Sequence, residues 1–273
     1  MVTLNIKQIQ AIVNEMLKET VDILNRNGIV FYMGYGSVLG TIRHNGSIPW
    51  DSDVDILVPI SMLDKARACL QNELSDRFMV HDTKNDKRYF FVFPRVALSK
   101  ESSCSIHLDI FPLIGLPEDR RRQVKLCNRL EKKCKLLVTY KQFRRLIVHK
   151  TFLRMSIGKC IELFCSPFSC RQLIKQYHRM LKDYSYDDAD FVTSGGACYG
   201  IKNILPKDIY GTPVWKDYCD FKVPVPEKWD EYLKNYYKDY MKYPSEEERN
   251  RGLAFTFDIS DEEYEMIKDV LGE

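Results

Sequence analysis

The sequence lacks any stretch of about 18 uncharged apolar residues, the length that a membrane-spanning helix requires. Lys7, Glu15 and Lys18 interrupt the N-terminal apolar positions, so we expect no secretion signal there. Internal repeats and low-complexity linkers are missing as well. Because 45% of the 273 residues are hydrophobic, wholesale disorder is excluded and a folded globular protein is predicted.

A C-x-x-C motif is also absent, although the chain contains nine cysteines. The number is odd, the spacing is irregular, and no secretion signal precedes them. This pattern predicts reduced thiols and not a disulfide framework, and it favours a cytoplasmic location.

Positive charge is concentrated in one segment, although the formal net charge is only +3. Residues 120–159 hold fourteen Lys and Arg and one acid, Glu131, whereas residues 227–273 carry fourteen acids and seven bases. This asymmetry indicates that one face of the molecule meets an anionic partner.

Hydrophobic periodicity and turn signals predict an α/β (α+β) fold, with strands and helices alternating in the N-terminal half. We expect helices at 5–26, 38–43, 227–243 and 260–271, strands at 29–33, 53–58, 89–98 and 105–111, and irregular structure at 184–226. Three parts follow: a core at 1–117, a basic helical region at 118–182, and a C-terminal segment at 183–273 that packs back on the core.

Three local signals mark where these elements begin or end. Ser61 with Asp64, and Ser260 with Glu263, have the spacing of a capping box at a helix start. Pro112 is expected to end the strand at 105–111, because proline cannot donate to a strand ladder.

Acidic side chains gather on one face of two predicted strands. Side chains alternate faces along a strand, so in 53–58 the apolar positions face the core and Asp53 and Asp55 face the other way. In 105–111 the same alternation puts Asp109 on the polar face. If the two strands are neighbours, three carboxylates share one surface, and such a cluster repels itself unless a cation neutralises it. Oxygen ligands of this kind suit Mg²⁺ or Mn²⁺, so we predict a metal site at Asp53, Asp55 and Asp109.

A glycine-rich turn precedes the acidic strand. Gly36 and Ser37 lie in the run GYGS, between a predicted strand and a short helix, where backbone amides can approach a phosphate. The order strand, Gly-Ser, helix, acidic strand and later third Asp resembles the layout of the nucleotidyltransferase superfamily that includes DNA polymerase beta. We therefore expect a nucleotidyltransferase-like core sheet with flanking helices and a helical basic insertion.

One family resemblance is more specific. Residues 36–55, GSVLGTIRHNGSIPWDSDVD, closely resemble the signature of the LicD/fukutin family of phosphotransferases, most of all its bacterial LicD members. HLDIFPL at 107–113 resembles the third-Asp element of that family, and KNILPKDIYG at 202–211 its C-terminal pattern. Ser52 stands where the family usually has another Asp, which affects substrate choice more than metal binding.

The resemblance implies transfer of a phospho-alcohol from a CDP-linked donor to a sugar hydroxyl of a lipid-linked glycan or teichoic acid precursor. Phosphocholine from CDP-choline is the preferred candidate. Asp53 and Asp55 would then hold Mg²⁺ at the diphosphate, and Asp109 would bind a second metal or take the hydroxyl proton. Arg43 and Lys202 are expected to bind donor oxygens.

A choline headgroup needs aromatic faces for cation–π contact. Trp50 is the expected contributor, together with Tyr35, Tyr199 or Tyr210. For Trp50, ordinary packing is an equally good interpretation of the sequence.

Two other functions fit the same residues. A true nucleotidyltransferase would attack an NTP and release pyrophosphate, and a glycan- or membrane-binding module would keep the site without using it. The presence of all three carboxylates favours an enzyme.

The basic segment at 120–159 interleaves its charges with apolar residues such as Leu126, Leu130 and Leu137. It is either an ordinary basic helical face, a nucleic-acid site or a surface that rests on anionic lipid. No recognised nucleic-acid module accompanies it, so we expect no nucleic-acid partner. A peripheral position at the inner face of the cell membrane is the preferred prediction.

Overall fold

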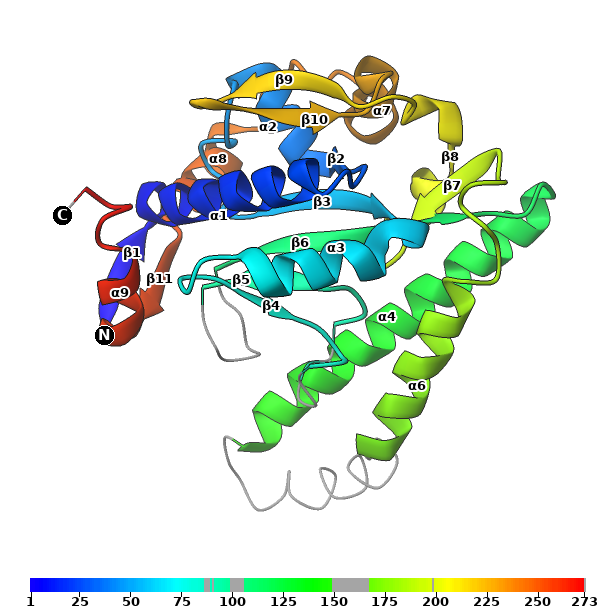
Figure 1. Cartoon of the computed structure of the whole chain (residues 1–273), viewed down its shortest axis with the longest axis horizontal. Helices are drawn as coiled ribbons and strands as arrows, with labels where there is room; N and C mark the ends of the chain where they lie inside the picture. The colour runs from blue at the N-terminus through cyan, green and yellow to red at the C-terminus, as the bar shows by residue number, and fades with distance from the viewer. Residues whose placement is uncertain (86–88, 90, 99–105, 149–166, 198, 273) are drawn as a thin grey trace.

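Helices and strands alternate over residues 2–81, and the computed structural model describes residues 1–85, 89, 91–98, 106–148, 167–197 and 199–272 (Figure 1). The strands are β1 (Val2–Asn5), β2 (Tyr32–Met33), β3 (Val54–Pro59), β4 (Met79–His81), β5 (Arg95–Ala97), β6 (His107–Gly115), β7 (Phe191–Ser194), β8 (Leu205–Pro206), β9 (Val214–Tyr218), β10 (Phe221–Val225) and β11 (Thr256–Ile259). The α-helices are α1 (Ile6–Arg26), α2 (Tyr35–His44), α3 (Ile60–Glu73), α4 (Arg120–Val148), α6 (Pro167–Met180), α7 (Trp229–Tyr237), α8 (Glu246–Leu253) and α9 (Asp261–Ile267), with short 3₁₀ turns η1 (Gly200–Asn203) and η2 (Lys207–Ile209).

The main sheet is mixed and has the strand order β2-β3-β6-β5-β4, and β7 and β8 continue it from β6. Only β3 and β6 run parallel; the other pairs within this sheet are antiparallel. Helices α1 and α3 cover one face (Figure 1). The predicted α+β class is confirmed, and the central parallel pair is the element that positions the acidic residues.

Helix α1 follows its sequence pattern closely. Asn5 caps it by accepting hydrogen bonds from the backbone of Lys7 and Gln8, and the Gln8 side chain returns one to Asn5. The apolar stripe, including Ile9, Met16 and Leu24, is fully buried against the sheet. An amphipathic helix of this length is stabilised mainly by that burial.

Pro112 does not end strand β6 as expected, because the strand continues to Gly115. The amide of Ile110 points to the β5 side, where it donates to the Pro94 carbonyl at 3.0 Å, and the nitrogen of residue 112 points the same way. On that side β6 pairs with β5 before Pro112 and with β7 after it. The missing N–H therefore falls where the partner strand changes, and the Pro112 carbonyl still accepts a hydrogen bond from the Gly195 amide at 2.7 Å.

Two further expectations are wrong, and one is confirmed. Helix α3 begins at Ile60, directly after Pro59, with no side-chain cap, so Ser61 and Asp64 form no capping box. The segment 184–226 is not irregular: it contributes β7, β8 and the β9–β10 hairpin. The capping box of Ser260 with Glu263 is confirmed at the start of α9.

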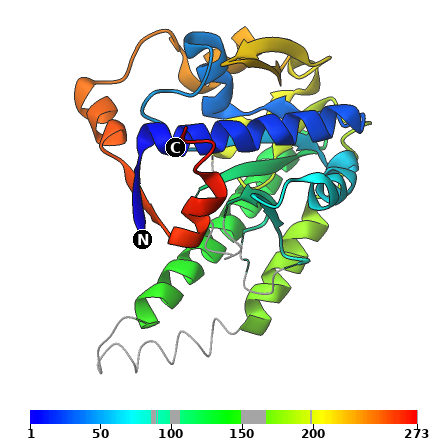
Figure 2. The same ribbon diagram turned by 60° about the vertical axis from the view of Figure 1, so that its left-hand side comes forward.

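The C-terminal segment pairs with strands of the core in two places. Strand β7 joins the main sheet beside β6, and β11 pairs antiparallel with β1, as Figure 2 shows. The sheet therefore takes strands from both sides of the basic region. The predicted part boundaries at 117 and 182 stay predictions.

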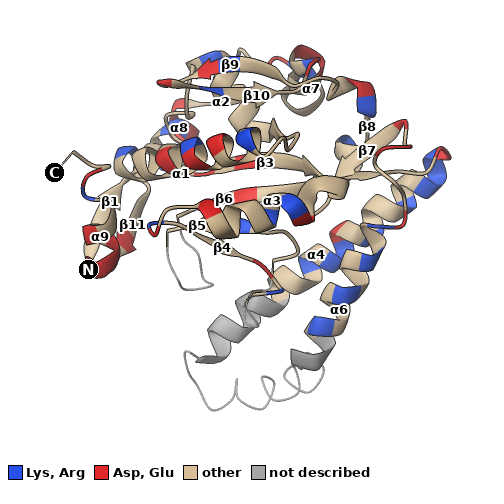
Figure 3. Cartoon of the chain, in the orientation of Figure 1, with Lys and Arg blue, Asp and Glu red and all other residues tan. Residues whose placement is uncertain are grey.

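Helices α4 and α6 pack against each other and extend away from the sheet, and Lys and Arg are spaced along both (Figure 3). Leu126, Leu130 and Leu137 are buried within this pair, so they are not available to a membrane. Leu136 and Val138 remain exposed. Residues 149–159 of the basic segment lie outside the described residues. Within the described part of the chain, no helix has the length and apolar character to cross a bilayer.

We expect Gly115→Ala to destabilise the fold, because a Cβ at this position of β6 would lie 2.1 Å from the carbonyl oxygen of Ser185. Overpacking against backbone costs about 1–3 kcal/mol of unfolding free energy. Urea denaturation followed by circular dichroism measures it. An unchanged midpoint would mean that the backbone at Ser185 can move aside without cost.

Candidate active site

The parallel register of β3 and β6 puts two carboxylates side by side. Asp55 is the register partner of Asp109, one residue after the buried pair Val54 and Leu108. Neighbouring strands lie about 4.8 Å apart, and register partners in a parallel pair share a face. The structure therefore brings Asp55 and Asp109 together on one face of the sheet, as the alternation predicted.

Asp53 and Asp51 complete an acidic run along one side of this pair. Asp53 precedes β3 and is exposed, whereas Asp51 is partly buried and accepts a hydrogen bond from the Ser52 backbone at 3.0 Å. The side chain of Gln10 on α1 holds this turn by donating to the carbonyls of Ile48 and Asp51, at 2.9 and 2.7 Å. Asp51 was missed from the sequence because it lies before the strand, where alternation no longer applies. The regular spacing of Asp51, Asp53 and Asp55, each two residues apart, is the sequence signal that could have indicated Asp51.

Repulsion between these carboxylates changes their acidity. Burial and the neighbouring Asp53 raise the pKa of Asp51 to about 7. Burial, followed by the charges of Asp53, Asp109 and Asp51, raises the pKa of Asp55 well above its usual range. The site therefore carries more negative charge than its surroundings neutralise.

Asp109 has a basic partner that the sequence did not indicate. The guanidinium of Arg95, on β5, contacts its two carboxylate oxygens at 2.5 and 3.1 Å, and both side chains are about nine-tenths buried. Arg95 is in register with Asp109 and stacks on Phe91 at 3.6 Å. His107 lies 3.5 Å from the same carboxylate. Asp109 is thus held in a two-point ion pair.

The turn before α2 is attached to Asp55 itself. The Asp55 amide donates to the Ser37 hydroxyl at 2.8 Å, and its carbonyl accepts from the Gly34 amide at 2.8 Å. Gly36 leaves room for the acidic run, because a Cβ there would lie 3.2 Å from a carboxylate oxygen of Asp51. The amides of Tyr35 and Ser37 already bond to the Tyr232 hydroxyl and the Gly34 carbonyl, so fewer donors remain for a phosphate than expected.

Tyr35 is the strained residue of this turn, with φ at +42°. Its ring stacks on Tyr199 at 4.7 Å and meets Tyr236 edge-on at 5.2 Å, and its hydroxyl bonds to Ser194 and Asn203. These contacts on every side stabilise a backbone conformation that costs of order 1–3 kcal/mol.

Of the four aromatic residues considered for a ligand cation, Tyr35 and Tyr199 lie together beside the carboxylates. Tyr199 is half-exposed, and burial followed by the charges of Asp55, Asp53 and Asp51 raises its pKa. Tyr237 is the further aromatic residue there, with its hydroxyl 4.0 Å from where a Cβ of Gly36 would be.

Trp50 and Tyr210 pack elsewhere. The Trp50 ring contacts His44 and Tyr243 at 5.7 and 5.9 Å between centroids. Tyr210 is buried against Tyr32 at 5.4 Å. These ring contacts are those of ordinary packing, and a substrate contact at Trp50 stays a prediction.

The two basic residues expected at the donor make other contacts. Arg43 donates to the carbonyls of Tyr240 and Lys242, at 2.8 and 3.3 Å, and stacks on Tyr243 at 4.7 Å. Lys202 is exposed in η1, and its carbonyl accepts from the Asn235 side chain at 2.8 Å. Arg43 thereby attaches the C-terminal segment to the core, whereas the Lys202 contact lies within that segment.

The acidic run offers carboxylate oxygens to a cation. Within the described ranges, no three His, Cys, Asp or Glu side chains converge closely enough to hold a metal on their own. Mg²⁺ usually takes one or two carboxylates and completes its shell with water and substrate phosphates. One or two of Asp51, Asp53 and Asp55 fit that partial set, and the metal site at Asp53, Asp55 and Asp109 stays a prediction.

The glycine turn, the start of α2 and the carboxylates of two adjacent strands define a nucleotidyltransferase-type site. A family model described as LicD/FKTN/FKRP, nucleotidyltransferase domain, matches residues 28–143, which include the whole acidic run and Asp109. Residues 28–143 therefore carry a domain of the LicD type.

Relatives extend the similarity beyond this domain. Lipopolysaccharide cholinephosphotransferase LicD of Haemophilus influenzae is 24% identical over 240 residues, covering 83% of this chain and 88% of the relative. Uncharacterized proteins of Rickettsia prowazekii and Rickettsia typhi are each 40% identical over 42 residues, which is 15% of this chain and 16% and 14% of theirs.

We expect Asp51→Asn to stabilise the metal-free protein at high pH. Because folding raises the pKa of Asp51 from 3.8 to about 7, its contribution to stability falls as the pH rises through that interval and is lowest above it. The variant should exceed the wild type by on the order of 1–3 kcal/mol at pH 8 and by clearly less at pH 5. Urea denaturation with a chelator at both pH values measures this. The same difference at both would contradict the assignment.

Proposed function

We propose that the protein transfers phosphocholine, or a related phospho-alcohol, from a CDP-linked donor to a sugar hydroxyl of a cell-surface glycan precursor. The Haemophilus relative is named as a cholinephosphotransferase of lipopolysaccharide. A teichoic acid precursor is a second candidate for the glycan acceptor. The observation that carries the proposal is the register of Asp55 with Asp109 inside the LicD-type domain.

The acidic run is the proposed cation site. Asp51, Asp53 and Asp55 repel one another, and a divalent cation relieves the repulsion that raises the pKa values of Asp51 and Asp55. When bound, Mg²⁺ or Mn²⁺ would neutralise the donor diphosphate and the charge that develops on the leaving group.

Asp109 is the proposed acceptor of the sugar hydroxyl proton. Its two-point pair with Arg95 fixes the carboxylate in one orientation, and His107 is close enough to pass the proton on. Phosphoryl transfer depends chiefly on positioning and on charge neutralisation, which are what these residues supply.

The tyrosines beside the carboxylates are the proposed choline site. Tyr199 stacks on Tyr35 and leaves half of its surface exposed, so one face of this pair is open to a quaternary ammonium group. This assignment replaces Trp50, whose ring is occupied by His44 and Tyr243.

Incubation with CDP-choline, Mg²⁺ and sugar acceptors tests the reaction. Release of CMP together with a phosphocholine-modified acceptor supports the proposal. Pyrophosphate released from an NTP would instead identify a nucleotidyltransferase, to which the description of the matched domain gives some weight. Absence of both products would favour a binding module.

Asp55→Asn should lower turnover on the order of a thousandfold, because it removes charge from the point where the donor diphosphate is neutralised. The matched control is Asp217→Asn on β9, an exposed residue paired with Lys222 at 3.2 Å. CMP release by the two purified variants is the measurement. Comparable rates for both would place the chemistry elsewhere.

We also propose that the α4–α6 pair holds the enzyme at an anionic membrane surface, where a lipid-linked acceptor is found. Exposed bases line both helices: Arg121, Arg122, Lys125, Arg129, Lys132 and Lys135 on α4, and Arg171, Lys175 and Arg179 on α6. In the part of α4 whose side chains the structure describes, residues 120–139, most apolar residues are buried, so attraction to lipid phosphates supplies most of the binding energy.

Neutralising Lys125, Arg129, Lys132 and Lys175 to Gln should weaken binding to phosphatidylserine vesicles by about 1 kcal/mol per residue. Wild-type binding should fall steeply between low and high salt. The control removes four lysines from the other end of the molecule: Lys216, Lys222, Lys228 and Lys234. Vesicle sedimentation measures both. Equal losses in the two variants would argue for a general charge effect and not for a docking surface.

A further inference from the structure

A cavity of about 270 Å³ lies between α3, the β4–β5 connection and α6. Its walls are mainly apolar and include Leu63, Phe91, Phe93 and Leu181. The volume equals that of about nine liquid water molecules, enough for a single ring or a short alkyl chain with a small head group. The composition, an apolar body with a few charged groups, is that of a small-molecule site.

This cavity is separate from the acidic site. Asp55 lies near the start of β3, and the cavity begins at Ile60, where α3 follows the end of that strand. Five residues of extended strand span about 16 Å. None of the acidic-run residues lines the cavity.

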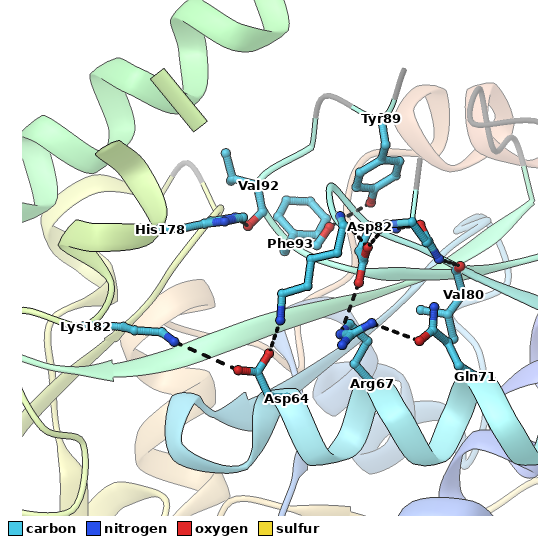
Figure 4. A network of polar contacts seen from close by, with 12 residues as sticks. Asp64, Arg67, Gln71, Val80, Asp82, Tyr89, Val92, Phe93, His178 and Lys182 are labelled. Carbon is cyan, nitrogen blue, oxygen red and sulfur yellow. Dashed lines mark hydrogen bonds and ion pairs between the residues drawn. The ribbon is translucent and has the colours of Figure 1, made fainter. Parts of the chain in front are cut away.

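One wall is held rigid by a buried ion pair, shown in Figure 4. Arg67 of α3 contacts Asp82 at 3.2 Å, and the side chains are only 19% and 6% exposed. The other carboxylate oxygen of Asp82 accepts hydrogen bonds from the amides of Lys84 and Asn85, at 2.6 and 2.8 Å. His178 of α6 contacts the Val92 carbonyl at 3.1 Å. These contacts form the site before any ligand binds.

The charges at the rim of the cavity do not cancel, unlike those of the buried Arg67–Asp82 pair. The ammonium groups of Lys84 and Lys182 approach one carboxylate, that of Asp64, at 2.5 and 3.9 Å (Figure 4). All three side chains are more than half exposed. Two cations thus share a single anion at the mouth, while the Arg67–Asp82 pair inside is neutral. The rim therefore carries a surplus of positive charge. Lys182 is the lysine that lies farther from Asp64.

We propose that this cavity is a second ligand site, for a small amphiphilic anion. The apolar body of the ligand packs on Phe91, Phe93 and Leu63, and its phosphate or carboxylate head lies at the rim between Lys84 and Lys182. A ligand there joins α6 to α3 and so attaches the basic helical pair to the sheet. The inference does not depend on the proposed transfer reaction.

Hexyl phosphate tests the site by isothermal titration calorimetry on the full-length protein. It should bind saturably, and hexanol and inorganic phosphate should each bind at least about tenfold more weakly, because each supplies only half of the contacts. If inorganic phosphate binds as tightly as hexyl phosphate, the rim takes an adventitious ion only and the proposal fails. It also fails if hexyl phosphate does not bind.

Three variants locate the binding. Lys84→Gln and Lys182→Gln alter exposed side chains and should each weaken hexyl phosphate binding several-fold, while Leu63→Trp should fill the cavity and abolish it. Lys65→Gln, on α3 but outside the cavity, is the control and should bind like the wild type. Equal affinity in the control and the two rim variants would overturn the site, even if Leu63→Trp fails to fold.

A competition experiment separates the two sources of such a ligand. Displacement of hexyl phosphate by vesicles containing phosphatidic acid, but not by phosphatidylcholine vesicles, indicates a lipid head group. If binding survives both kinds of vesicle, the site takes a soluble phosphate ester.

Discussion

The parallel pairing of β3 with β6 forces like charges together, and the rest of the site is arranged around that constraint. Its register makes Asp55 the neighbour of Asp109, and the turn before β3 adds Asp51 and Asp53. Only Asp109 is neutralised by a fixed partner within this group, through Arg95 on the next strand. The charge of Asp109 is thus neutralised by the protein itself. The charge of the acidic run is left without a fixed basic partner of this kind. Carboxylates that repel one another without fixed partners favour a divalent cation.

The same repulsion explains why several groups around the site form hydrogen bonds to the backbone of the acidic residues. Gln10 reaches from α1 to two carbonyls of the acidic turn, and Ser37 and Gly34 bind both polar backbone groups of Asp55. The tyrosines around Tyr35 hold its strained conformation. Repelling carboxylates would otherwise move apart, so preorganisation here comes from hydrogen bonds to the main chain and not from the acidic side chains themselves.

Local rules predicted local features, and failures began where a contact joined distant segments. Strand alternation placed Asp55 and Asp109 on one face, and the cap at Ser260 followed from its spacing to Glu263. Arg95 was missed because its role comes from antiparallel pairing with β6, which no local pattern encodes. Arg43 and Trp50 were assigned to substrate because their contacts with the 240–243 segment, about 200 residues away, cannot be inferred from periodicity. The β9–β10 hairpin was missed because prolines and aromatic residues mask its alternation.

Pro112 divides the hydrogen-bond ladder on one side of β6 into two short ladders, one with β5 and one with β7. Cooperative opening depends on continuous hydrogen bonding, so the two can exchange their amide protons with solvent independently. The β5 side carries the Arg95–Asp109 pair, and the β7 side carries the returning C-terminal segment, including Ser194 beside Tyr35. Loosening of that segment can therefore open the tyrosine side of the site to solvent while the ion pair stays closed. The change of partner strand beside Pro112 therefore allows one wall of the site to open while the other stays closed.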